Sequence, residues 1–77
     1  MLAEITELDV RGLTCPMPLL KAKQALNKLQ DGDCLRVLAT DAGSVRDFKS
    51  FAGLSSHHLL SSEEIDGVFI FMLKKQS

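Results

Sequence analysis

The segment LTCPMPLL, residues 13–20, joins an alternating apolar segment to the longest helical pattern of the chain. In it Cys15 is followed directly by Pro16, and Pro18 comes two residues later. Proline is favoured in the first turn of a helix, because its missing N–H would have no partner there and its fixed φ suits the helix. The segment therefore predicts a helix that begins at Pro16, with Cys15 as its N-cap.

A cysteine at a helix N-terminus is expected to be reactive. The helix dipole favours an anion there by about 0.3–1 kcal/mol at an exposed site. Because Pro18 offers no N–H, the backbone of Met17 is the one donor expected near the sulfur. The sequence thus predicts that the thiolate form of Cys15 is favoured but accepts few hydrogen bonds, which leaves it nucleophilic. The alternative is a buried and inert cysteine, since free Cys is among the most buried residue types.

The spacing around Cys15 also excludes one kind of chemistry. In Cys-x-x-Cys redox sites the second cysteine resolves a mixed disulfide, and Pro18 occupies that position here. An intramolecular dithiol cycle at this site is therefore excluded. Cys15 could instead carry a persulfide sulfur, an acyl group or a transient disulfide to a partner.

Length and composition indicate one small globular domain, residues 1–77, with 45% hydrophobic and 25% charged residues. Such a composition excludes a disordered chain. A domain of this length has only a marginal hydrophobic core, so its apolar residues must pack efficiently. We find no apolar run of membrane-spanning length and no basic-then-apolar leader, so we expect a cytoplasmic protein without membrane contact. The net charge of −1 argues against direct nucleic-acid binding.

The remaining candidate ligands do not form a metal site. Adjacent His57 and His58 point to opposite faces of a strand, and neither cysteine has a partner at zinc-site spacing. We expect no metal, no cofactor and two reduced, unpaired thiols. Cys34 is predicted to open a strand, in a structural role or as a minor oxidation site on an uncovered sheet face.

Hydrophobic periodicity predicts the order βαβαββ: strands at 4–10 and 34–40, helices at 16–29 and from Ser44 to Gly53, and a hairpin of 57–63 with 68–74. Gly32 suits a left-handed conformation after the first helix, and Asp66-Gly67 is a strong signal for the hairpin turn. In the second strand Leu35, Val37 and Ala39 share one face. The resulting fold class is α/β, a two-layer sandwich of a four-stranded mixed sheet with two helices on one face. The expected core positions are Leu8, Val10, Leu19, Ala22, Leu26, Leu29, Val45, Phe48, Phe51 and Ala52. The last strand is apolar on both faces, so one of its faces could form an interaction patch.

A right-handed crossover makes the first two strands parallel and puts Cys15 at their carboxyl edge. Gly12 gives the loop before Cys15 its conformational freedom. Asp41 follows the second strand and is expected close to Cys15. A turn role for Asp41 is favoured over a direct part in the chemistry, because a carboxylate disfavours a nearby thiolate.

Two further features are expected around the helices. Ser44 is the predicted cap of the second helix, and Asp47, three residues later, completes a pair that resembles a capping box. Lys21 and Lys23 lie off the apolar stripe of the first helix. Each is ordinarily a solvated side chain, but together they are expected to attract an acidic partner and favour an anionic sulfur.

The run LDVRGLTCPMP, residues 8–18, resembles the opening of the TusA-type sulfur-carrier family, also known as SirA or YhhP, which has a Leu-Asp, a Gly-Leu and then Cys-Pro-x-Pro. TDAGSVRD, residues 40–47, is similar to the family's second signature, a turn that leads into the second helix. Together they give a specific match over nearly the whole chain. The chain departs from the family pattern at two positions. Ala42 replaces the usual turn proline, and Met17 occupies a position where the tRNA-thiolation members often have Glu.

The resemblance implies a sulfur carrier, with Cys15 as the persulfide-bearing residue and Gly12, Pro16, Met17, Pro18 and Asp41 as its supporting motif. It implies a cysteine desulfurase or a rhodanese-like protein as donor, and tRNA 2-thiouridine formation or molybdenum-cofactor biosynthesis as destination. With no recognisable second catalytic group, we expect a monomeric sulfurtransferase-type shuttle rather than a stand-alone enzyme. The alternatives are a regulatory or RNA- or protein-binding module, and a redox partner that uses mixed disulfides.

Overall fold

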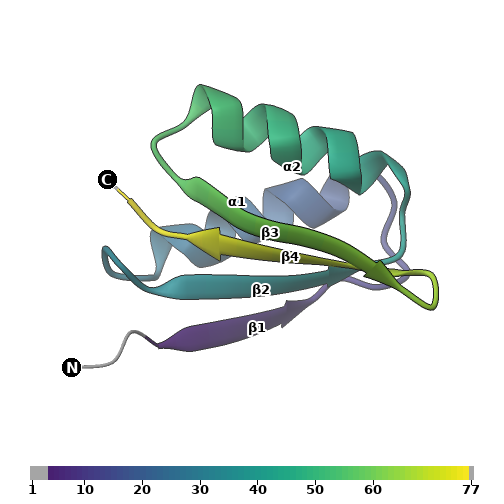
Figure 1. Cartoon of the computed structure of the whole chain (residues 1–77), viewed down its shortest axis with the longest axis horizontal. Coiled ribbons are helices and arrows are strands. Elements are labelled where there is room, and N and C mark those ends of the chain that lie inside the picture. The colour runs from purple at the N-terminus through teal and green to yellow at the C-terminus, as the bar shows by residue number, and fades with distance from the viewer. Residues whose placement is uncertain (1–3, 77) are drawn as a thin grey trace.

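The computed structural model describes residues 4–76, which form four strands and two helices. In chain order these are β1 (Ile5–Asp9), α1 (Met17–Asn27), β2 (Cys34–Ala39), α2 (Gly43–Leu54), β3 (His58–Ile65) and β4 (Val68–Lys74). The sheet order is β1-β2-β4-β3; β1 and β2 are parallel, and β4 is antiparallel to both of its neighbours. Both helices cover the same face of this sheet (Figure 1), which confirms the predicted two-layer fold.

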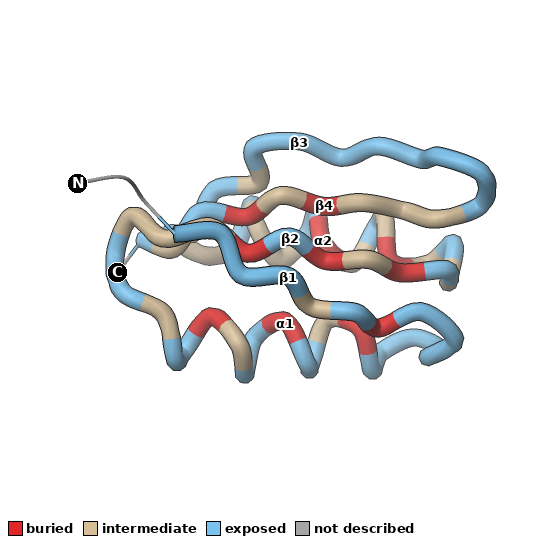
Figure 2. Tube along the Cα trace, turned by 90° about the horizontal axis from the view of Figure 1, so that it is seen from below, coloured by how far each residue is buried: buried red, intermediate tan, exposed pale blue. Residues whose placement is uncertain are grey.

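The core lies between the helices and the two central strands. Figure 2 shows buried positions on β2 and β4 and on the side of α1 that faces the sheet, whereas β3 is exposed along most of its length. The rings of Phe48 in α2 and Phe71 in β4 stack with centroids 4.4 Å apart and an interplanar angle of 13°. This stack fixes α2 on the sheet, because both side chains are fully buried. The other buried apolar residues are Val10, Ala22, Leu26, Leu35, Val37, Ala39 and Leu73.

The turn between α1 and β2 requires a glycine. Gly32 has φ +92°, in the left-handed region that a residue with a Cβ rarely adopts. The predicted backbone conformation is therefore confirmed, but α1 ends at Asn27, earlier than expected. Gly32 belongs to a separate turn that the Asp33 N–H closes by donating to the Gln30 carbonyl over 3.0 Å.

The β3–β4 hairpin turns at Asp66 and Gly67, which both have positive φ, 50° and 81°. Two consecutive positive φ values are typical of a type I′ turn, so the turn predicted from this dipeptide is confirmed. Strand β3 extends to Ile65, beyond the predicted end, and it carries an irregularity between Leu59 and Ser61.

No helix or strand within residues 4–76 covers the face of the sheet away from the helices. In β4 the side chains of Phe71 and Leu73 are buried against the helices, while Ile70 and Met72 on the opposite face are half-buried. Cys34 is half-buried and alternates with the core-facing residues of β2, so it lies on this open face. Neither helix within residues 4–76 is long and apolar enough to cross a membrane.

Candidate functional site around Cys15

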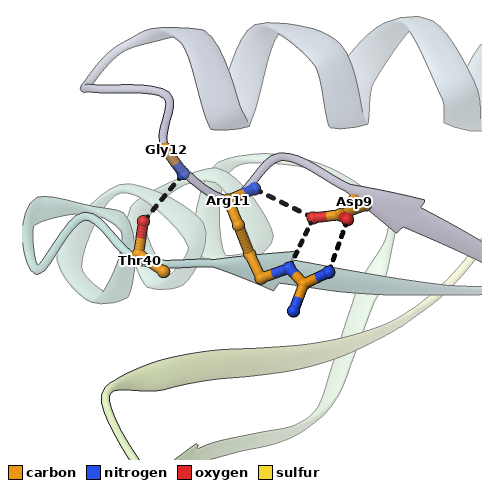
Figure 3. Close-up of polar contacts among 4 residues, drawn as sticks. All are labelled: Asp9, Arg11, Gly12 and Thr40. Atoms are coloured by element: carbon orange, nitrogen blue, oxygen red, sulfur yellow. Dashed lines mark hydrogen bonds and ion pairs between the residues drawn. The ribbon is translucent and has the colours of Figure 1, made fainter.

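The loop that carries Cys15 is tied to the carboxyl ends of β1 and β2. The Gly12 N–H donates to Oγ1 of Thr40 over 2.8 Å (Figure 3). Gly12 has φ +84°, so the chain reverses here in a conformation that suits glycine. The Val10 N–H donates to the Leu38 carbonyl over 2.8 Å, which continues the parallel pairing to the start of the loop. The loop therefore lies at the predicted edge of the sheet.

An ion pair closes the same loop on its outer side. Nε and Nη2 of Arg11 donate to the two carboxylate oxygens of Asp9 over 2.9 and 2.8 Å, and the Arg11 backbone N–H also donates to this carboxylate (Figure 3). These bonds lower the pKa of Asp9 from 3.8 to about 2. The pair is half-exposed, so it orders the loop more than it stabilises the fold.

The predicted N-cap is off by one residue. The Met17 N–H donates to the Thr14 carbonyl over 2.9 Å and closes a turn before the helix begins. The N-cap is therefore Pro16, whose carbonyl accepts from the Leu20 N–H over 3.1 Å. Cys15 precedes the cap, and the expected bond from Met17 to the sulfur is not made, because the turn has taken that donor.

A carboxylate from α2 contacts the sulfur instead. Sγ of Cys15 donates to Oδ2 of Asp47 over 2.7 Å, across 32 residues of sequence. Cys15 is exposed and Asp47 is half-buried. The sequence showed no recognisable second catalytic group beside Cys15, and Asp47 is the site residue that sequence reasoning missed.

The charges around Cys15 favour its neutral form. The hydrogen bond to Asp47 is the largest cause that raises the pKa of the Cys15 thiol above its ordinary value. Desolvation and the negative charges of Asp47 and Asp41 raise this pKa further, and only the nearby positive charge of Arg46 lowers it. The predicted thiolate is thus not favoured in this structure, because the hydrogen bond to Asp47, desolvation and the two carboxylate charges outweigh the charge of Arg46.

Asp41 lies close to Cys15, as expected. A Cβ built on Gly43 would lie 3.0 Å from Oδ2 of Asp41 and 3.7 Å from Cβ of Cys15. That Asp41 oxygen is buried and has no hydrogen-bond partner. Asp41 does serve the turn, but through its backbone: its carbonyl accepts from the Ser44 N–H over 3.0 Å.

The predicted capping pair of Ser44 and Asp47 is wrong. The N-cap of α2 is Ala42, and no side chain caps this helix. Ser44 is only 1% exposed, and its hydroxyl has no hydrogen-bond partner. Asp47 accepts from the cysteine thiol, so it does not reach back to the start of its own helix.

A groove of about 420 Å³ is lined in part by Asp47, the residue that contacts the sulfur. Leu54 at the end of α2 also lines this groove and is 90% exposed. The other lining residues are Leu19, Lys23, Ser50, Phe51 and Ser55. The groove thus runs between the two helices and offers apolar surface that is connected to the thiol through Asp47.

The lysines predicted to flank the site lie on α1, and both are exposed. Nζ of Lys23 lies 5.5 Å from the centroid of the Phe51 ring, so this cation borders the groove. Arg46, and neither Lys21 nor Lys23, is the cation that acts on the pKa of Cys15. Their expected effect on the sulfur is therefore not seen, while the expectation that they contact a partner stays a prediction.

Both cysteines are free thiols. Among residues 4–76, no group of His, Cys, Asp and Glu is arranged to hold a metal ion. The fold and the site together define a small α/β protein with one exposed thiol, a carboxylate that accepts from it and no second cysteine beside it.

Comparisons with known proteins agree with this class. The family model described as Sulfurtransferase TusA matches residues 6–75. The sulfur carrier protein TusA of Allochromatium vinosum is 49% identical over 69 residues, which cover 90% of this chain and 91% of the relative. A putative sulfur carrier protein of Neisseria meningitidis is 51% identical over 67 residues, 87% of this chain and 90% of its own.

A solved structure shows the same fold. The SirA-like protein of Desulfitobacterium hafniense superposes with a TM-score of 0.81 at 27% identity, over 95% of this chain and 99% of its own. The chain belongs to the TusA family, as its two sequence signatures indicated.

Proposed function

We propose that this protein is a sulfur carrier whose Cys15 accepts a sulfane sulfur as a persulfide and passes it to an acceptor protein. The observation that carries the proposal is the exposed Cys15 thiol at the carboxyl edge of the sheet, next to a groove and without a second cysteine. Because no thiol lies beside it, the carrier does not reduce its own cargo. The names of the relatives support the same role.

The chemistry needs no cofactor in this chain. Cys15 attacks the terminal sulfur of a persulfide on the donor, a new S–S bond forms at Sγ, and the donor's S–S bond breaks. One thiol and one persulfide give one persulfide and one thiol, so no oxidant or reductant is consumed. Transfer to the acceptor is the same exchange in the other direction, by the thiolate chemistry that governs disulfide exchange.

The partners that fit are a cysteine desulfurase or a rhodanese-like protein as donor, and an acceptor in tRNA 2-thiouridine or molybdenum-cofactor synthesis. The groove beside Cys15 supports docking of such proteins, because it combines the exposed Leu54 with the cation of Lys23. Lys21 extends the basic flank of α1. Met17 is 39% exposed on the same helix, in the position where a Glu is common, and we propose that it influences the choice of acceptor.

Two unpaired thiols suit a reducing compartment, which supports a cytoplasmic location. With a groove that must receive its partners in turn, we propose that the carrier acts as a monomer.

The test is intact-mass analysis after incubation with a cysteine desulfurase, pyridoxal phosphate and cysteine, for wild type, Cys15→Ser and Cys34→Ser. We expect wild type and Cys34→Ser to gain the mass of one sulfur atom and Cys15→Ser to gain none. Equal labelling of Cys15→Ser would show that Cys15 is not the carrier. If neither this donor nor a rhodanese labels any of the three proteins, a binding or regulatory role takes precedence.

A further inference from the structure

In the hydrogen bond between Cys15 and Asp47 the thiol is the donor and the carboxylate is the acceptor. The thiol donates its proton to a carboxylate that also lines the groove where a donor protein would dock. Asp41, the other acid of the site, holds one oxygen buried and without a partner. Asp47 is therefore the acid that contacts the reacting sulfur and that a docked partner can also reach.

We propose that Asp47 is the catalytic acid–base residue of the sulfur-transfer step, taking the proton from Cys15 as the sulfur attacks. The inference rests on the proposed carrier function and adds a residue to it. The argument has three parts: the contact itself, the balance of the proton, and the fate of the contact once sulfur is bound.

The contact matters because the reactive form of the site is not its resting form. The thiolate is the nucleophile, yet Asp47 and Asp41 both favour the protonated thiol. Transfer of the proton to Asp47 alone is uphill, because a carboxylate is a much weaker base than a thiolate. The proton must therefore move as the new S–S bond forms, and its acceptor must already be within hydrogen-bond distance. Asp47 at 2.7 Å meets this geometric condition.

The proton balance closes within the complex. As Sγ of Cys15 bonds to the donor's terminal sulfur, the thiol proton passes to Asp47, and the electron pair of the broken S–S bond leaves on the donor cysteine. Asp47 then returns the proton to that leaving thiolate. The carboxylate ends the step unprotonated, as it began, and Asp47 lines the groove in which we propose that the donor docks.

Loading then removes the hydrogen bond. The persulfide Sγ carries no proton, so it has nothing to donate to Asp47. The acquired sulfur extends about 2.05 Å beyond Sγ, and its negative charge is repelled by the carboxylates of Asp47 and Asp41. The same acid that assists uptake thus directs the bound sulfur outward, toward the acceptor.

The test compares two reactions of the same thiol in wild type and Asp47→Asn. The first is alkylation by iodoacetamide, which needs only the thiolate. The second is the single-turnover rate of sulfur uptake from a persulfidated cysteine desulfurase, followed by mass. Glu4→Gln is the control, because it also removes one carboxylate. Glu4 is exposed and lies at the amino end of β1, on the opposite edge of the sheet from Cys15.

We expect Asp47→Asn to change the two rates in opposite directions. Alkylation near neutral pH should become several-fold faster, because the thiol loses its carboxylate acceptor. Sulfur uptake should become at least about tenfold slower. This is a cautious figure, because general acid–base groups typically contribute ~10²–10⁴-fold. Between about pH 6 and 8 the uptake rate of the variant should rise more steeply with pH than that of wild type, because the variant must wait for free thiolate. Glu4→Gln should match wild type in both reactions.

Three results would overturn the proposal. If Asp47→Asn speeds both reactions, Asp47 only restrains the thiol; if it slows both or changes neither, the acid–base role is wrong. Circular dichroism and thermal unfolding qualify each variant, and Asp47→Ser replaces Asp47→Asn if the latter does not fold. If wild type takes up no sulfur at all, the proposed carrier function itself is wrong. This outcome differs from the three results above, in which wild type takes up sulfur and only the role of Asp47 is tested.

Discussion

Ser44→Ala gives the sharpest test of how α2 begins. As a helix cap, Ser44 would stabilise the protein, and its replacement by alanine would cost about 0.5–2 kcal/mol. In the structure the residue is 1% exposed, and its hydroxyl has no hydrogen-bond partner. A buried hydroxyl without a partner costs about 1–3 kcal/mol, and alanine removes it with little change in volume. We therefore expect Ser44→Ala to raise the free energy of unfolding by about 1–2 kcal/mol.

Urea denaturation followed by circular dichroism measures the effect. The denaturant slope of a small domain is about 1–3 kcal/mol per M, so the midpoint should rise by roughly 0.3–2 M with an unchanged slope. Ser50→Ala is the matched control, because Ser50 is an exposed serine in the same helix. It should gain at most about 0.7 kcal/mol, from helix propensity alone.

A lower midpoint for Ser44→Ala would refute this reasoning. It would mean that the hydroxyl has a partner in solution, and Oδ2 of Asp41, the neighbouring buried oxygen without one, is the candidate. Ser44→Ala in an Asp41→Ala background settles that case, since the loss should then disappear.

Three further predictions concern the core and the loop before Cys15. Phe48→Ala should cost about 3–5 kcal/mol, measured by the same urea titration, because it empties a fully buried site stacked on Phe71; Phe48→Leu should cost less. Gly12→Ala should cost about 1–2 kcal/mol, from the backbone conformation alone, because nothing lies within 4 Å of the added Cβ. The Asp9 carboxylate should titrate by NMR near pH 2, and Arg11→Gln should return its midpoint toward 3.8. Because the pKa of Asp9 is depressed in the folded state, the pair's contribution to stability is present above pH 3.8 and is lost as the pH falls toward 2. An unchanged titration midpoint of Asp9 in Arg11→Gln would contradict the pairing.

Local patterns were sufficient to predict the order and layers of the fold. The alternation of Leu35, Val37 and Ala39 placed these residues on one face of β2, and in the structure all three are fully buried. The dipeptide Asp66-Gly67 marked the hairpin turn, because few other pairs tolerate two positive φ values. Such features depend on neighbouring residues alone, so one sequence suffices to predict them.

The site was only partly predictable, because its electrostatics depend on contacts between distant segments. The position of Cys15 at the carboxyl edge followed from the topology. Its bond to Asp47 depends on how α2 is rotated over the sheet, which the packing of Phe48 against Phe71 decides. One signal was present: Asp47 lies four residues before Phe51, on the helical face that borders the groove. The capping-box pattern concealed it, because it assigned this carboxylate to its own helix.

The bond between Cys15 and Asp47 spans 32 residues, so it exists only when the chain is folded. In the unfolded chain the thiol regains its ordinary acidity and reacts faster with electrophiles near neutral pH. The raised pKa of Cys15 in the native state also makes the stability of the fold depend on pH. The stabilisation from this thiol is complete below its ordinary pKa, and it is lost as the pH rises through the higher pKa of the native state. The alkylation rate of Cys15, measured in a Cys34→Ser background, therefore reports whether the contact with Asp47 is formed.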